Sequence, residues 1–160
     1  MPESSNHRIL THRFADIPIK VITTVYLNSI SSQNQGRIPV NAAWDTGAQK
    51  TIITPYLEEI LNLQPIYQVF INGVHGRNQS NIVLVDVEFP NGATFKNLEA
   101  AVCPFNNDPN SDLHMLIGMD IISQGDFVLS NGGGYTLFSF ASPSFPYKID
   151  LAAEMQEKQG

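Results

Sequence analysis

An apolar stretch of the sequence stops abruptly at an aspartate. Ala42-Ala43-Trp44 is followed directly by Asp45, Thr46 and Gly47, and apolar residues return at Thr51-Ile52-Ile53. Because removing a carboxylate from water costs several kcal/mol, an acid at the end of a buried strand needs hydrogen bonds or a chemical role. Thr46 can hydrogen-bond neighbouring backbone, and Gly47 allows a turn where a Cβ would clash. The sequence therefore predicts a tight loop that holds the Asp45 carboxylate.

A second apolar stretch, residues 115–122, contains Leu116-Ile117-Gly118. An Asp-Thr-Gly triplet alone also fits an ordinary turn after a strand, so the two motifs are considered together. In this order they resemble the retropepsin-like family of aspartic proteases, in the style of its cellular and bacterial single-domain members. Asp45-Thr46-Gly47-Ala48 matches the family's Asp-Thr/Ser-Gly-Ala loop, and Leu116-Ile117-Gly118 matches its later apolar-apolar-Gly strand. The resemblance covers residues 21–140.

The resemblance implies an all-β fold, namely a closed retropepsin-like (acid protease) β-barrel with one or two short helices and a flap hairpin. It also implies a catalytic acid, a loop that supports this acid, a flap that contacts substrate, and a strand end that packs beneath the site. The residues in these roles are Asp45 as the catalytic acid, Thr46, Gly47 and Ala48 in the loop, Gly73, Val74, His75 and Gly76 in the flap, and Leu116, Ile117 and Gly118 beneath the site.

Residue patterns along the chain favour the same fold class. Segments rich in β-branched and aromatic residues alternate with turn formers and predict short strands. These strands are expected over residues 21–28, 37–44, 68–71, 82–89, 94–102, 113–117, 127–130 and 135–140. Thr54 as N-cap and Pro55 at the first position predict a short helix over 54–61, and residues 149–156 suggest a terminal helix. About eight short strands with little helix indicate a closed or strongly bent β-barrel.

The stretch 72–81 separates two of these strands and contains two glycines and several amide side chains. Such a composition predicts a hairpin with a long, flexible tip. In the resemblance this is the flap, and the alternative is an ordinary surface loop, because the position in the chain is the main argument. His75 is accordingly a flap or surface residue and not a ligand.

Length and composition indicate one folded domain. With 160 residues, 42% of them hydrophobic and 15% charged, the chain can bury one core but is too short for two domains of usual size. We expect a flexible N-terminal arm over 1–16, the protease domain over 17–141 and a C-terminal extension over 142–160. The polar start lacks the features of a signal peptide, and Cys103 is the only cysteine. A cytoplasmic location without intrachain disulfides is therefore expected.

Several function classes are excluded by charge and spacing. The net charge is −6 with nine Lys and Arg, which leaves no basic stripe for a nucleic acid partner. No apolar run approaches the roughly 20 residues of a membrane helix, so no membrane partner is expected. The four histidines show no metal-ligand spacing, so neither a metal nor another cofactor is expected. Cys103, beside Ala101-Val102, fits a small buried hydrophobe better than a nucleophile.

The chemistry implied by the resemblance needs two carboxylates. An aspartic protease activates water between two acids that share one proton, because two like charges at hydrogen-bonding distance cannot both ionise. A second Asp-Thr-Gly or Asp-Ser-Gly does not occur in the sequence. We therefore expect a homodimer in which each chain contributes Asp45 at the two-fold axis.

Two positions depart from the retroviral members of the family. Those members carry an acid shortly after the catalytic loop and an arginine after the motif glycine, where this chain has Gln49 and Met119. We therefore expect the dimer to be held differently, with Trp44, Phe70 or the terminal segments as candidates. Asp120 is interpreted as a helix-start acid that satisfies backbone donors rather than as a catalytic group.

The leading function is a homodimeric aspartic endopeptidase that acts on an extended peptide or protein substrate held under the flaps. The alternative from another class is a catalytically weak dimeric module that binds peptides or regulates. A third possibility, a non-proteolytic β-barrel with a chance motif, predicts a stable monomer.

Overall fold

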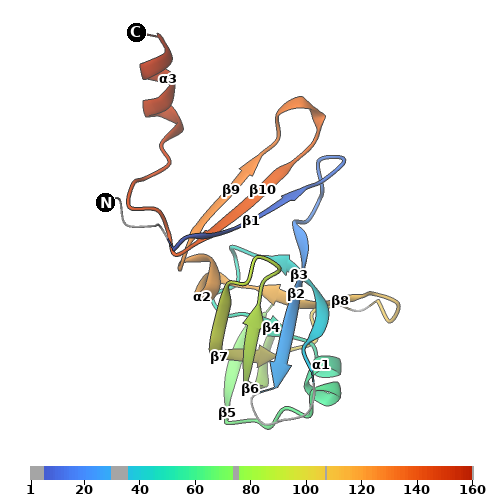
Figure 1. The fold of residues 1–160 in the computed structure, drawn as a ribbon. Helices are drawn as coiled ribbons and strands as arrows, with labels where there is room; N and C mark the ends of the chain where they lie inside the picture. Colours follow the sequence, from blue (N-terminus) through green and yellow to red (C-terminus); the bar gives the residue numbers. More distant parts are fainter. Residues whose placement is uncertain (1–5, 30–35, 74–75, 107, 160) are drawn as a thin grey trace.

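The computed structural model describes residues 6–29, 36–73, 76–106 and 108–159. Two sheets make up most of it, a large one that forms a barrel and a smaller one that lies across one end of the barrel (Figure 1). The barrel strands are β2 (Ile22–Ser29), β3 (Ile38–Trp44), β4 (Ile52–Ile53), β6 (Gly76–Glu88), β7 (Thr94–Val102) and β8 (Leu113–Ile117). β5 (Tyr67–Gly73) pairs only with β6 and completes the large sheet.

The barrel closes because β2, the first strand in the sheet order, also pairs with β6 near the other end of that order. In that order, β2-β3-β8-β4-β7-β6-β5, an additional antiparallel pairing joins β2 to β6 through Tyr26–Glu88 and Ser29–Val85. Side chains alternate inward along these strands, so Val83, Val85 and Val87 of β6 are fully buried. The prediction of an all-β closed barrel with few short helices is thus confirmed.

The smaller sheet has the order β1-β10-β9 and is built from both ends of the chain. Its strands are β1 (Arg8–Arg13), β9 (Asp126–Ser130) and β10 (Leu137–Ser142), and the short helical turn η1 (Gly132–Gly134) joins the last two. Residues 8–13 were expected within a flexible arm, and this expectation is wrong. Their backbone is paired with β10 from Arg8 against Ser142 to Arg13 against Leu137.

An aromatic cluster joins the smaller sheet to the barrel. Trp44 lies 4.9 Å from the ring centroids of both Phe138 and Phe140, and its ring stacks on Phe89 at 5.5 Å. Its Nε1–H donates to Thr23 Oγ1 at 3.0 Å, so the polar end of the buried indole is satisfied. Trp44 is only 8% exposed and belongs to the hydrophobic core, so the expectation that it could hold a dimer together is wrong.

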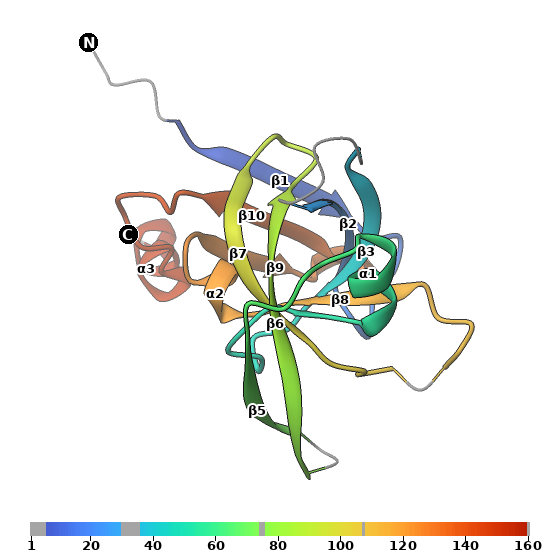
Figure 2. The same cartoon turned by 90° about the horizontal axis from the view of Figure 1, so that it is seen from below.

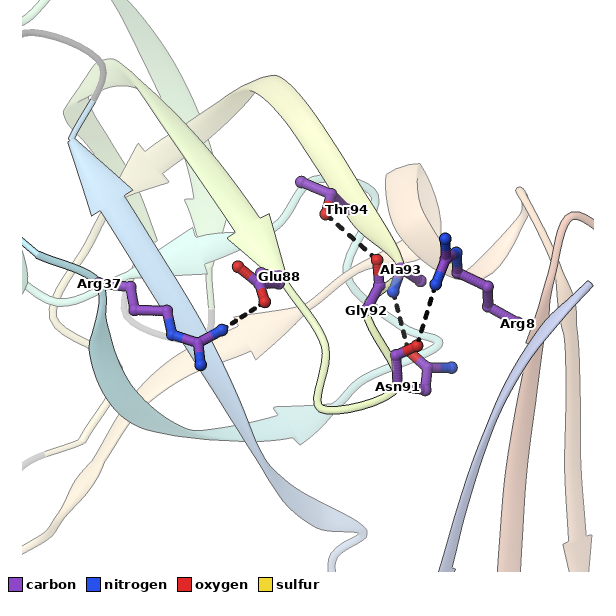
Figure 3. Close-up of polar contacts among 7 residues, drawn as sticks. All are labelled: Arg8, Arg37, Glu88, Asn91, Gly92, Ala93 and Thr94. Carbon is purple, nitrogen blue, oxygen red and sulfur yellow. Dashed lines mark hydrogen bonds and ion pairs between the residues drawn. The ribbon is translucent and has the colours of Figure 1, made fainter.

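Polar contacts add a second link between the sheets, shown in Figure 3. The Arg8 guanidinium of β1 donates to the Asn91 carbonyl in the turn between β6 and β7 at 3.4 Å. Asn91 Oδ1 also accepts the Ala93 N–H at 3.0 Å, which shapes this turn. Arg37, just before β3, pairs with Glu88 at the end of β6 and ties these two barrel strands together.

The helices are short and lie outside the barrel. They are α1 (Pro55–Ile60), α2 (Met119–Ile122) and α3 (Leu151–Gln159), which extends away from both sheets (Figure 1). The short helix expected over 54–61 and the terminal helix are therefore confirmed. Thr54 takes the N-cap position of α1, but its hydroxyl hydrogen-bonds His114 Nδ1 at 3.0 Å instead of capping the helix. Within the described residues, no helix has the length and apolar character needed to cross a membrane.

Candidate active site

The loop after β3 holds Asp45 through the backbone around it. The Asp45 N–H donates to the Ile117 carbonyl at 2.9 Å and thereby continues the contact between β3 and β8 beyond Trp44. The Gly47 N–H donates to Asp45 Oδ1 at 2.9 Å, and the Ala48 N–H donates to the Asp45 carbonyl at 3.2 Å. The carboxylate is thus oriented by its own loop. Asp45 is half-buried, whereas Thr46 and Gly47 are exposed.

The start of α2 packs directly beneath this loop. The Met119 N–H donates to the Ala48 carbonyl at 2.8 Å, and the Asp120 N–H donates to the Gln49 carbonyl at 3.2 Å. A Cβ on Gly118 would lie 2.7 Å from the carbonyl carbon and oxygen of Lys50 and 2.9 Å from the Ala48 oxygen. Only glycine allows this approach of backbone to backbone, as expected for a residue packed beneath the Asp45 loop.

Thr51 connects the loop to both Gly118 and Asp120. The fully buried Thr51 hydroxyl accepts the Gly118 N–H at 3.2 Å and donates to Asp120 Oδ1 at 2.7 Å. The Thr51 N–H donates to Asp120 Oδ2 at 2.8 Å. Asp120 therefore satisfies backbone donors, as predicted, but its main partner is the far end of the Asp45 loop rather than its own helix alone. The contact between Thr51 and Asp120 secures the Asp45 loop in a chain that has Gln49 and Met119 in place of the acid and the arginine of the retroviral members.

A pocket of about 490 Å³ opens beside Asp45. Its walls come from segments that are distant in sequence: strands β3 and β8, the residues before β2, the loop after β7, and β9. The lining residues are Ile19, Lys20, Val21, Ala43, Trp44, Asp45, Thr46, Phe105, Asn106, Leu113, Leu116, Phe127 and Leu129. The pocket is thus mainly apolar, with the Asp45 carboxylate in its wall.

Within the motif Leu116-Ile117-Gly118, the first two residues have different surroundings. Leu116 is half-buried and lines the pocket next to Asp45, whereas Ile117 points to the other face of β8 and is fully buried in the core. The motif therefore supplies one residue to the pocket, one to the core and, in Gly118, one to the packing beneath the loop.

The β5–β6 hairpin projects from the barrel (Figure 2). Gly73 pairs with Gly76 at its end, and Gly76 has a φ of 102°, which favours glycine. Val74 and His75, the other two residues predicted in the flap, lie outside the described residues. Phe70 is 60% exposed on the hairpin and lies beneath the Arg77 guanidinium at 4.2 Å.

A polar cluster connects the base of this hairpin to the Asp45 loop. Glu99 Oε2 of β7 accepts hydrogen bonds from Lys50 Nζ at 2.8 Å and from the Tyr67 hydroxyl at 2.5 Å. The hydrogen bonds from Lys50 and Tyr67 lower the pKa of Glu99, and the bond to Glu99 raises the pKa of Tyr67. Partial burial alone would lower the pKa of Lys50, but the hydrogen bond and charge of Glu99 outweigh it and raise that pKa.

Residues 30–121 match the aspartyl protease family, which is more than half of the chain and includes both motifs and the hairpin. The chain belongs to the aspartyl protease family. Among solved structures, a retropepsin-like aspartic protease from Rickettsia conorii superposes with a TM-score of 0.55 at 13% identity, covering 85% of this chain and 95% of that one. EIAV protease in complex with the inhibitor HBY-793 gives a TM-score of 0.48 at 23% identity, over 65% of this chain and 86% of that one. A search of curated proteins found no matching sequence.

The Rickettsia likeness shows that this aspartyl protease family member has the retropepsin-like fold. Sequence reasoning found its Asp45 loop and the glycine beneath it, but it missed other parts of the site. Thr51 had one available signal, since it is a hydroxyl residue beside the apolar pair Ile52-Ile53. Lys20, Phe105 and Phe127 had none, because only the folded chain brings them to the pocket. Among the described residues, no group of three His, Cys, Asp or Glu side chains could hold a metal ion.

Proposed function

We propose that the protein is a homodimeric aspartic endopeptidase in which the Asp45 carboxylates of two copies activate one water molecule. The observation that carries the proposal is the Asp45 loop itself. Its carboxylate is held by a backbone donor beside an apolar pocket, while Thr46 and Gly47 of the same loop are exposed. An exposed loop carrying half of a catalytic pair fits a surface that a second copy covers.

The two carboxylates would divide the chemistry between them. Because they share one proton, the ionised Asp45 takes a proton from water, and the water oxygen attacks the peptide carbonyl carbon. The protonated Asp45 gives its proton to the carbonyl oxygen, which yields a tetrahedral gem-diol. Return of a proton to the amide nitrogen then lets the C–N bond break, and the products are a carboxylic acid and an amine.

The pocket beside Asp45 supports an apolar side chain next to the bond that is cut. Ala43, Leu116 and Phe105 give it apolar walls, and burial of such a side chain contributes about 25 cal/mol per Å² of apolar surface. The β5–β6 hairpin would close over an extended peptide, offer backbone hydrogen bonds and exclude water.

Asp45→Asn is the decisive variant, because it is nearly isosteric and removes only the ionisable group. We expect the wild type to cleave a mixed peptide library with pepstatin-sensitive activity, and Asp45→Asn to lose turnover while it keeps its circular dichroism spectrum. Light scattering should show a dimer at micromolar concentration, either alone or with a bound peptide inhibitor. Turnover in the purified variant, or activity from a protein that stays monomeric under both conditions, would refute the shared site.

The second candidate is a catalytically weak dimeric module that binds peptides or regulates. It predicts peptide binding that Asp45→Asn leaves unchanged and no cleavage by the wild type.

A further inference from the structure

Two hollows on the surface of the barrel flank a pair of rings in contact. Tyr56 at the start of α1 and His114 of β8 have ring centroids 4.6 Å apart, and both side chains line both hollows. One hollow, of about 510 Å³, lies between β3 and α1. The other, of about 450 Å³, lies against the loop after β7. Together they form one surface depression, called here the His114 groove.

The His114 groove adjoins the pocket beside Asp45. Asn106 and Leu113 line both that pocket and the nearer of the two hollows. The outer face of β8 presents Leu116 to the pocket and His114 to the groove, two residues apart on the same side of the strand. A chain bound at Asp45 could therefore continue into the groove along one surface.

The shape of the groove is fixed by contacts within the barrel. The His114 ring is held by the hydrogen bond between Nδ1 and Thr54 Oγ1, and Asn41 Nδ2 donates to Asp112 Oδ2 at 2.8 Å. Tyr56 remains 53% exposed and Ile60 of the same helix 40% exposed. The groove is thus a preformed surface with exposed apolar groups, which favours binding without a large ordering cost.

The charge of the groove selects its ligand. Asp108 and Asp112 are exposed carboxylates that line it, and no lysine or arginine is among the residues that form either hollow. An exposed tyrosine ring beside carboxylates favours a cation, because the ring face and the acids both attract positive charge. A lysine or arginine side chain meets both conditions, and its aliphatic part can cover Ile60.

We propose that the His114 groove is a docking site for a basic segment of the polypeptide substrate, several residues away from the bond that is cut. The proposal rests on the proposed function, since the segment belongs to the chain held at Asp45. Asn41, which borders the groove, precedes Asp45 by four positions along β3, a distance of about 13 Å at about 3.3 Å per residue. The basic residue would therefore lie roughly four to six positions from the cut bond, on at least one side of it.

The test compares peptides that share one core sequence, chosen from the library because it binds Asp45→Asn, and that differ only in a six-residue extension. The extension contains either two lysines or two glutamates and is placed at either end. Binding is measured by fluorescence anisotropy to Asp45→Asn, and KM and kcat are measured with the wild type. We expect the lysine extension at one end to bind about fivefold more tightly and to lower KM by the same factor, with kcat unchanged, because a remote contact acts on substrate and transition state alike.

Variants locate the effect. Asp108→Asn and Asp112→Asn should each reduce the gain in binding that the lysine extension gives, and Tyr56→Ala should abolish this gain. The asparagine in Asp112→Asn can keep the hydrogen bond with Asn41. Glu59→Gln is the matched control, since Glu59 is an exposed acid on α1 that does not line the groove. None of these changes should alter binding of the core peptide.

The outcomes separate the two proposals. Equal binding of lysine and glutamate extensions, or a lysine preference that survives Asp112→Asn and Tyr56→Ala, would overturn the docking site even if the core peptide is cleaved. Loss of the preference in Glu59→Gln to the same degree would also overturn it, because the effect would then be a general one of net charge. A lysine preference in binding without any cleavage by the wild type would retain the groove and refute the endopeptidase.

Discussion

Gly118→Ala tests whether the start of α2 positions the Asp45 loop. Gly118 has a φ of −93°, which any residue adopts, so the effect of the substitution comes from the added methyl group and not from backbone strain. That methyl would lie 2.7 Å from the carbonyl carbon and oxygen of Lys50, and these backbone atoms have no rotamer by which to move aside. The loop and α2 must therefore separate.

The size of the effect follows from the contacts that separation disturbs. Overpacking of a tight site costs about 1–3 kcal/mol, and weakening of the 2.8 Å hydrogen bond from Met119 to Ala48 adds about 1 kcal/mol. A loss of about 2–4 kcal/mol lowers the melting temperature of a chain of this length by roughly 5–15 °C. Because a displacement of about 1 Å at a catalytic group can cost on the order of a hundredfold in rate, kcat should fall by a similar factor.

The assay is thermal unfolding followed by circular dichroism, together with peptide cleavage. Gly132→Ala is the matched control, because a Cβ at Gly132 would meet no atom within 4 Å. We expect Gly132→Ala to melt within a few degrees of the wild type and to keep its activity. If Gly118→Ala behaved like this control in both measurements, the close packing of α2 beneath the loop would not position Asp45.

Three further predictions concern the contacts around the site. Thr51→Val should destabilise the fold by about 1–3 kcal/mol in chemical denaturation, because the buried Gly118 N–H and Asp120 each lose a partner; a change below 0.5 kcal/mol would contradict this. Amide exchange over 77–79 in the hairpin should be faster than over 83–87 and should slow with a peptide inhibitor, whereas equal rates would identify a structural loop. Glu99→Gln should make the melting temperature less sensitive to acid. Because the pKa of Glu99 is lowered in the folded protein, its contribution to stability is present above the ordinary glutamate pKa of about 4.3 and is lost as the pH falls below that value. An unchanged melting profile between about pH 5 and pH 3 would refute that role.

Local chemistry explains why the centre of the site could be predicted. A carboxylate at the end of an apolar run needs a partner, and the Gly47 N–H supplies one two residues after Asp45, while the Ala48 N–H closes the turn on the Asp45 carbonyl. Segments rich in β-branched and aromatic residues between turn formers likewise predicted the barrel strands other than the two-residue β4. Such signals lie within a few neighbouring residues and need no knowledge of the rest of the chain.

Other features could not be read in this way. Residues 8–13 are polar apart from Ile9 and Leu10, and they form β1 only because β10 offers its edge, more than a hundred positions later in the chain. Trp44 looked available for an interface, yet Phe138 and Phe140 arrive from the same distant hairpin and enclose it. In both cases the deciding partner is far away in sequence and leaves no trace in local periodicity.

The sequence by itself determined where the acid stands and where most of the strands lie, because both depend on the chemistry of adjacent residues, and the resemblance of its two motifs to a known family pointed to the glycine beneath the acid. Only the tertiary structure decided how Thr51 reaches Asp120, which walls surround Asp45 and that the His114 groove leads away from it. These arrangements depend on which strand edges pair and how the barrel closes, and that choice is made by packing summed over the whole chain.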